Sequence, residues 1–124
     1  MSQTSSRAKS LSVEANGRRY SAPANPTVVI CVDGFDPTYL EHGIANGTLP
    51  TMASFRENWF VGIADCCMPS TTNTNNTSIV TGVPPSVHGI NGNYYLDSET
   101  GEEVMVTDAK RLRSGTILGA LSQA

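Results

Sequence analysis

The stretch TVVICVDGFDP, residues 27–37, decides the fold. Its first six residues are mostly β-branched or apolar, which is typical of a strand buried on both faces. The strand must end before Pro37, because proline has no amide hydrogen. Asp36 and Pro37 suit the N-cap and first position of a helix over residues 37–46, and Gly47 ends that helix. The stretch therefore predicts a strand, a loop that carries carboxylates, and a helix.

The same alternation continues downstream. Apolar residues at helical spacing after Pro50 predict a second helix, and residues 60–65 predict a second buried strand. In residues 68–82, MPSTTNTNNTSIVTG, ten of fifteen residues are Ser, Thr or Asn. Such composition fits either a low-complexity linker or a loop that leads into a short helix, and the apolar Ile79 and Val80 favour the helix.

The two ends of the chain carry further elements. Asn16 and Gly17 lie between two short runs and give a strong hairpin signal, so residues 1–22 are interpreted as an N-terminal tail and a hairpin arm. Residues 23–124 form the α/β part. Its last predicted elements are a hairpin of residues 94–96 with 104–106 and a helix over residues 114–124.

Composition excludes several function classes. The 124 residues carry a formal charge of −3, and the only basic cluster is Lys110, Arg111 and Arg113, so a nucleic-acid partner is not expected. No apolar run reaches the roughly 20 residues of a membrane span, and the start lacks the apolar segment of a signal peptide, so we expect a cytoplasmic protein without membrane contact.

The cysteines do not form a disulfide framework, because there are three of them and two are neighbours, Cys66 and Cys67. A zinc site on this pair is disfavoured, since it needs two more suitably spaced ligands and the only histidines are His42 and His88.

Polar residues that could carry chemistry follow both predicted strands. Asp33 comes directly after the first, and ligands of open α/β sheets bind outside the carboxyl ends of strands. The alternative is an Asp that only stabilises its own turn. Thr71 and Thr72 follow the second strand, where one hydroxyl could be a nucleophile if a base or a metal activates it. The alternative is an ordinary helix cap.

Three further candidates come later in the chain. His88, in a constrained turn, is either catalytic or held by backbone groups. Asn91 and Asn93 either present amide donors to a ligand or adopt left-handed backbone geometry. His42 is expected on the surface of its helix.

As an ordered set, the motifs resemble the alkaline phosphatase superfamily and, within it, the phosphodiesterase-like branch. The similarity is greatest to the phosphonoacetate hydrolase family. It covers about residues 12–124 and lies in VVICVDGFDPTYL from Val28, TLPTMASF from Thr48 and PSTTNTNNTSIVTGVPPSVHGINGN from Pro69. The resemblance implies an α/β fold, the N-terminal part of a three-layer α/β/α sandwich. We expect this part to be incomplete, because two core strands are too few for a whole sheet.

The resemblance also implies roles for individual residues. Asp33 matches a metal-binding aspartate, Thr72 matches the nucleophile that also contacts a metal, and Asn93 matches an asparagine that holds a phosphoryl oxygen. Thr71 stands where the family often has an aromatic residue, so the nucleophile could be Thr71 instead. The TN pair of Thr72 and Asn73 favours Thr72.

For the complete enzyme, the resemblance implies a site with two zinc ions that cleaves the C–P bond of a small molecule, phosphonoacetate, through a phosphothreonine. The resemblance is compatible with a homodimer. The family's other metal ligands and its carboxylate-binding lysines come later than this chain, so the 124 residues alone are expected to be inactive. The alternatives are a nucleotide pyrophosphatase or phosphodiesterase of the same superfamily and a non-catalytic fragment.

Overall fold

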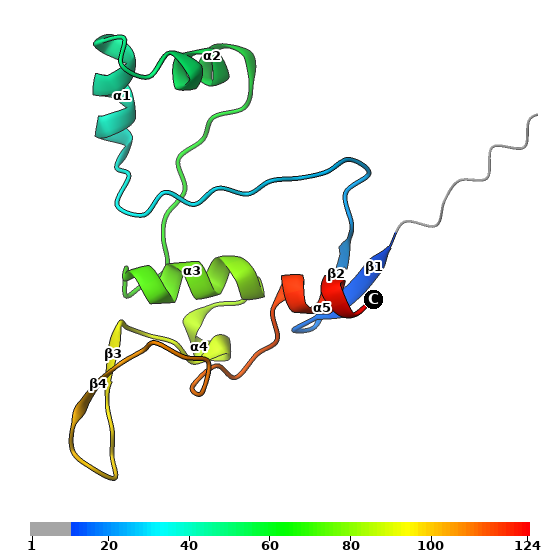
Figure 1. Cartoon of the computed structure of the whole chain (residues 1–124), viewed down its shortest axis with the longest axis vertical. Helices are drawn as coiled ribbons and strands as arrows, with labels where there is room; N and C mark the ends of the chain where they lie inside the picture. Colours follow the sequence, from blue (N-terminus) through cyan, green and yellow to red (C-terminus); the bar gives the residue numbers. More distant parts are fainter. Residues whose placement is uncertain (1–10) are drawn as a thin grey trace, which may run out of the picture. The chain divides into compact units, whose positions relative to one another are not determined.

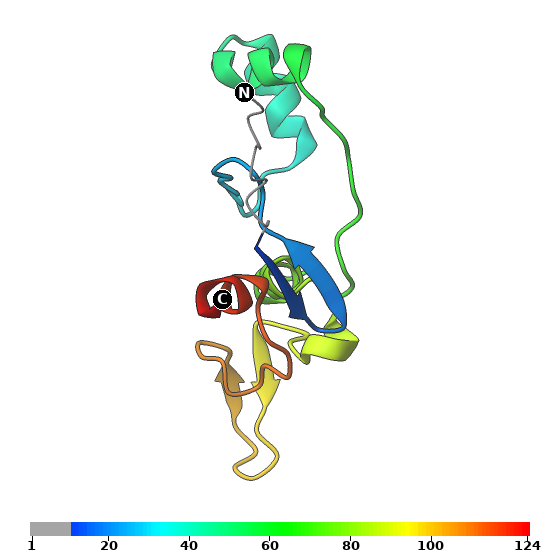
Figure 2. The same ribbon diagram turned by 90° about the vertical axis from the view of Figure 1, so that its right-hand side faces the viewer.

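The computed structural model describes residues 11–124, shown from two directions in Figures 1 and 2. These residues divide into two compact units, one of residues 11–28 with 66–124 and the other of residues 29–65. The tail expected over the first ten residues lies outside the described part of the chain.

The N-terminal arm is an antiparallel hairpin of β1 (Ser12–Ala15) and β2 (Arg18–Ser21). Asn16 and Gly17 join the strands with φ angles of 51° and 76°. A type I′ turn needs positive φ at both of its central residues, and asparagine and glycine tolerate this best. The predicted hairpin is confirmed.

Within its unit, the arm contacts α3 (Thr72–Thr81) and α5 (Ile117–Gln123). The Asn16 side chain donates 2.8 Å hydrogen bonds to the carbonyls of Thr81 and Gly115. Alternate residues of β1, Val13 and Ala15, are buried, and α5 lies against this strand (Figure 2). The turn residue that closes the hairpin thus also anchors it.

The segment rich in Ser, Thr and Asn is mainly helical, which confirms the helix and excludes the linker. α3 ends at Gly82, whose φ of 69° is the left-handed conformation that glycine adopts at helix ends. A short helix, α4 (Pro85–His88), follows and packs against α3. Val83 and Ile90, on either side of α4, are buried apolar residues of this unit.

The remaining elements of this unit differ slightly from their predicted bounds. β3 (Tyr94–Leu96) pairs with β4 (Glu103–Met105), one residue earlier than predicted for the second strand. α5 starts later than the predicted residue 114, because the Thr116 side chain accepts a hydrogen bond from the amide of Gly119 and so caps the helix there.

The second unit contains two helices that contact each other, α1 (Pro37–Ala45) and α2 (Pro50–Asn58). The Asp36 side chain caps α1 by accepting a 2.8 Å hydrogen bond from the amide of Thr38. Hydrogen bonds from the side chain and from the backbone amide of Thr38 lower the pKa of Asp36. Both helices begin at the predicted prolines.

The two predicted core strands, residues 27–32 and 60–65, are wrong as strands in this structure. Neither segment joins a ladder, and the sheets among the described residues are the two hairpins. Their side chains are exposed, by 80% for Ile30 and 94% for Phe60. A strand needs neighbouring backbone groups to pair with, and no strand among residues 11–124 pairs with either apolar segment.

No disulfide joins the three cysteines, all of which are described. Among the described residues, no helix is both long and apolar enough to cross a membrane.

Candidate active site at the N-terminus of α3

Thr72 is the first residue of α3 and is exposed. The residue before it, Thr71, is the N-cap, with φ −122° and ψ 157°, but its side chain makes no capping bond. The Thr71 hydroxyl instead lies 2.6 Å from the hydroxyl of Thr74, which is fully buried. The two neighbouring hydroxyls therefore differ: that of Thr71 is tied to the interior, and that of Thr72 is on the surface.

The loop that leads into α3 is held by Asn75. Its Oδ1 accepts a 3.1 Å hydrogen bond from the amide of Cys67, and its Nδ2 donates a 3.1 Å bond to the carbonyl of Thr71. The Cys67 thiol also donates to this Oδ1, at 3.0 Å. One side chain thus fixes both ends of the loop directly before Thr72.

Asn93 meets the first turn of α3. Its Oδ1 accepts a 3.0 Å hydrogen bond from the amide of Asn73, the residue after Thr72. The first amides of a helix have no partner within the helix, and here a side chain twenty residues later satisfies one of them. The structure thus brings two of the three predicted site residues, Thr72 and Asn93, to one place.

His88 is fully buried. Its Nδ1 accepts a 3.1 Å hydrogen bond from the amide of Ile90, so the ring proton belongs on Nε2, which lies 2.9 Å from the Ser78 hydroxyl. Burial lowers the pKa of His88 and favours the neutral ring. The structure therefore supports the interpretation that backbone groups hold His88. His42 is exposed on α1, as expected.

Asp33 is exposed and lies in the unit of residues 29–65, whereas Thr72 and Asn93 lie in the other unit. Within residues 11–124, no group of three or more His, Cys, Asp or Glu could hold a metal ion. Asp33 offers a carboxylate of the kind that zinc binds. The described residues thus provide at most part of a ligand set.

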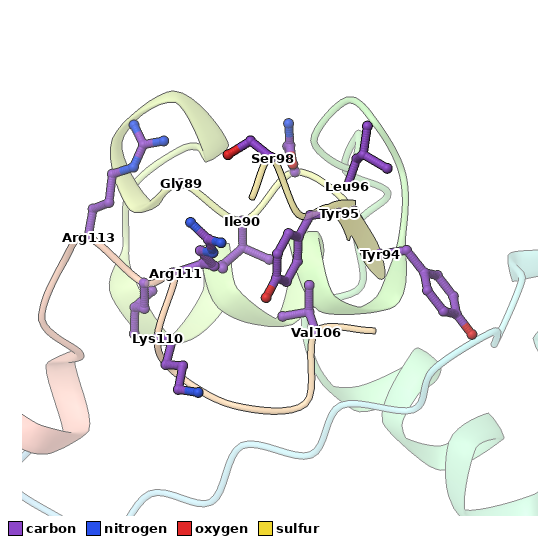
Figure 3. Close-up of a pocket in the computed structure, with 13 residues that line it drawn as sticks. Gly89, Ile90, Tyr94, Tyr95, Leu96, Ser98, Val106, Lys110, Arg111 and Arg113 are labelled. Atoms are coloured by element: carbon purple, nitrogen blue, oxygen red, sulfur yellow. The ribbon is translucent and has the colours of Figure 1, made fainter. Parts of the chain in front are cut away.

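A cavity of about 440 Å³ lies beside the loop that carries Asn93 (Figure 3). It is lined in part by Gly92 and Tyr94, the residues before and after Asn93. The guanidinium carbon of Arg111 lies 4.5 Å from the centre of the Tyr95 ring, and its Nη2 lies 3.9 Å from a carboxylate oxygen of Asp97. The sequence shows Arg111 only as part of a small basic cluster. Its stacking partner comes from the hairpin and gives no signal along the chain.

Sequence reasoning also missed the side chain of Asn73. Its Nδ2 donates a 3.0 Å hydrogen bond to the carbonyl of Val106, directly after β4. The only signal was an asparagine in the first turn of a predicted helix, where its side chain can bind nearby backbone groups.

Comparison with known proteins gives the family. The family model of type I phosphodiesterases / nucleotide pyrophosphatases matches residues 27–122. An uncharacterized pyrophosphatase/phosphodiesterase of Schizosaccharomyces pombe is 38% identical over 77 residues, which are 61% of this chain and 15% of that protein.

Among solved structures, the chain is similar to phosphonoacetate hydrolase from Sinorhizobium meliloti 1021. The complex with phosphonoformate matches with 46% identity and a TM-score of 0.83 over 93% of this chain. The complex with phosphonoacetate matches with 45% identity and the same TM-score. The chain spans 28% of the length of that enzyme. The α/β class is confirmed, and the chain belongs to the type I phosphodiesterase / nucleotide pyrophosphatase family of the alkaline phosphatase superfamily.

Proposed function

We propose that this chain carries the nucleophile region of a zinc-dependent phosphonoacetate hydrolase. The observation that carries the proposal is the meeting of Asn93 with the first turn of α3, beside the exposed Thr72. The high identity to phosphonoacetate hydrolase supports the choice of substrate.

In the proposed reaction, Thr72 Oγ1 attacks the phosphorus of phosphonoacetate in line with the departing carbon. The O–P bond forms, the C–P bond breaks, and the electron pair leaves with the carbon, which takes up a proton and becomes acetate. The hydroxyl proton of Thr72 passes to solvent. Water then hydrolyses the phosphothreonine, which releases phosphate and restores the hydroxyl.

The chain's own groups stabilise the negative charge that the phosphoryl oxygens carry. The Nδ2 of Asn93 donates to a non-bridging oxygen, and the N-terminal end of α3 adds the positive end of the helix dipole. Donors that are already in place cost no reorganisation during the reaction. Removal of one such donor typically costs about 100- to 1000-fold in kcat.

Zinc fits this proposal in part, since Asp33 and Thr72 would be two ligands of a set that the described residues do not complete. When bound, two zinc ions supply the positive charge that lets a phosphonate dianion approach an anionic nucleophile.

The test starts from the protein as its own organism makes it. The intact mass is measured first, then phosphate release from phosphonoacetate with zinc added. Phosphate release that a metal chelator abolishes and zinc restores is the expected result. Activity that is unchanged after complete zinc removal would contradict the proposed zinc dependence.

The second candidate is a nucleotide pyrophosphatase or phosphodiesterase that uses the same residues on a P–O bond. The family model and the Schizosaccharomyces pombe relative favour it. Comparison of kcat/KM for phosphonoacetate and for a nitrophenyl phosphodiester separates the two. Faster cleavage of the diester would make the phosphodiesterase the better assignment.

A further inference from the structure

We infer that Asn73 is a positioning residue that holds the side-chain amide of Asn93 near the proposed nucleophile, Thr72. The inference rests on the proposed function. It starts from three hydrogen bonds that join three residues far apart in sequence. The Asn73 amide donates to Asn93 Oδ1 at 3.0 Å, and Asn73 Nδ2 donates to the Val106 carbonyl at 3.0 Å. The Val106 amide donates to the Asn93 carbonyl at 2.8 Å, which closes the ring.

The ring determines which way the Asn93 amide faces. The Oδ1 of Asn93 accepts a hydrogen bond from the backbone amide of Asn73, so the two N–H groups of Nδ2 must point elsewhere. Within residues 11–124, Nδ2 donates to no other residue and is not a buried unsatisfied atom. The ring thus leaves these two donors available beside the residue that follows Thr72.

Two of the three bonds use the backbone amides of residues 73 and 106 as donors, so they do not depend on the Asn73 side chain. The third depends on the Asn73 side chain alone, which ties α3 to the end of the β3–β4 hairpin. Gly92, directly before Asn93, makes the loop between α4 and β3 conformationally permissive. The bond from the Asn73 side chain to Val106 therefore restricts the conformations of the loop that carries Asn93.

The test is a double-mutant cycle on kcat/KM for phosphonoacetate in the intact, zinc-loaded protein. Asn73→Ala keeps the backbone amide and removes only the bond to Val106, and we expect a loss of roughly 10- to 100-fold, mostly in kcat. In the Asn93→Ala background the same substitution should cost less than about twofold, because the donor it positions is already absent. Equal losses in both backgrounds would overturn the inference.

A matched control comes from α2. The Nδ2 of Asn58 donates a 2.9 Å hydrogen bond to the Ser54 carbonyl, so Asn58→Ala loses the same kind of bond as Asn73→Ala. Asn58 is distant in sequence from Thr72 and Asn93 and belongs to the other unit. We expect its kcat/KM to remain that of the unsubstituted protein. Asn73→Ser, whose hydroxyl is too short for this bond, replaces Asn73→Ala if the alanine variant fails to fold.

A second readout does not need activity. The side-chain amide resonances of Asn93 in a ¹⁵N NMR spectrum should shift toward ordinary solvent-exposed values in Asn73→Ala and stay unchanged in Asn58→Ala. Unchanged Asn93 resonances in Asn73→Ala would overturn the positioning role, whatever the activity. If the unsubstituted protein hydrolyses neither phosphonoacetate nor a diester, the proposed function fails, and the NMR comparison alone decides the positioning role.

Discussion

At the N-terminus of α3, two adjacent threonines with the same functional group have different surroundings. The Thr71 hydroxyl is 2.6 Å from the buried hydroxyl of Thr74, whereas Thr72 lies at the surface. A nucleophile must reach its substrate, so exposure favours Thr72 over Thr71. Sequence alone left this choice open, because both residues fit a helix start.

Substitution of each threonine by alanine should therefore have opposite consequences. Thr72→Ala should abolish turnover and keep the fold. Thr71→Ala should keep substantial activity and lower the free energy of unfolding by about 1–3 kcal/mol, since it leaves the buried Thr74 hydroxyl without this partner. Steady-state kinetics and urea unfolding of both variants measure these effects. Activity lost in Thr71→Ala but kept in Thr72→Ala would identify Thr71 as the nucleophile.

His88 makes the stability of its unit depend on pH. Its pKa in the folded state is below the ordinary value of 6.5 because of burial. Between these two pKa values the unfolded chain binds more protons than the folded one, so the free energy of unfolding falls as the pH drops below about 6.5. Above that pH the contribution of His88 is fully present.

Urea unfolding at about pH 7.5 and about pH 5 tests this, since histidine titrates between these values. We expect the unsubstituted protein to lose more stability between the two pH values than His88→Gln, which cannot titrate. An equal loss in both proteins would assign the pH dependence to other groups.

At the scale of elements, the hairpin arm and α3 depend on close contact at Gly82. A Cβ built on Gly82 would collide with the Tyr20 hydroxyl of β2 and would lie 3.2 Å from Cδ1 of Ile117 in α5. Three elements therefore meet at a residue that has no side chain. Gly82 serves both as the left-handed end of α3 and as the point of closest packing.

This double role predicts a large difference between two glycine substitutions. Gly82 and Gly101 have nearly the same φ, 69° and 72°, but a Cβ on Gly101 meets nothing within 4 Å. Gly101→Ala should cost only the left-handed penalty of about 1–2 kcal/mol, and Gly82→Ala should cost a further ~1–3 kcal/mol from overpacking. Thermal unfolding of both variants measures this. Equal costs would show that Tyr20 moves aside freely.

At the scale of the whole molecule, the two units differ in how they are held together. The unit of residues 11–28 and 66–124 has buried side chains on β1, on α3 and around α4, whereas no residue of α1 or α2 is buried. The apolar segments 28–32 and 60–63 are exposed. Local opening should therefore be much easier in these segments than in α3.

Hydrogen exchange of the 124-residue chain should show this contrast. We expect the amides of residues 28–32 and 60–63 to exchange at least about 100-fold faster than those in the middle of α3, because hydrogen-bonded and buried amides open rarely. Protection of the two apolar segments equal to that of α3 would mean that they are paired in solution.

The sequence alone determined features whose cause is local. Asn16–Gly17 specified a tight turn through its tolerance of positive φ, Asp36–Pro37 specified a helix start, and Gly47 specified the end of that helix. These signals work because the φ preference or the capping group belongs to the residue itself. The ordered motifs also identified the superfamily, which the comparisons confirm.

Only the tertiary structure decided what depends on a distant partner. Residues 27–32 and 60–65 have strand composition, but a strand forms only where another backbone pairs with it. The burial of His88, the contact of Asn93 with α3 and the bond from Asn73 to Val106 likewise join residues 10 to 33 positions apart. Such contacts arise when the chain packs, and the spacing of residues along the sequence does not encode their geometry.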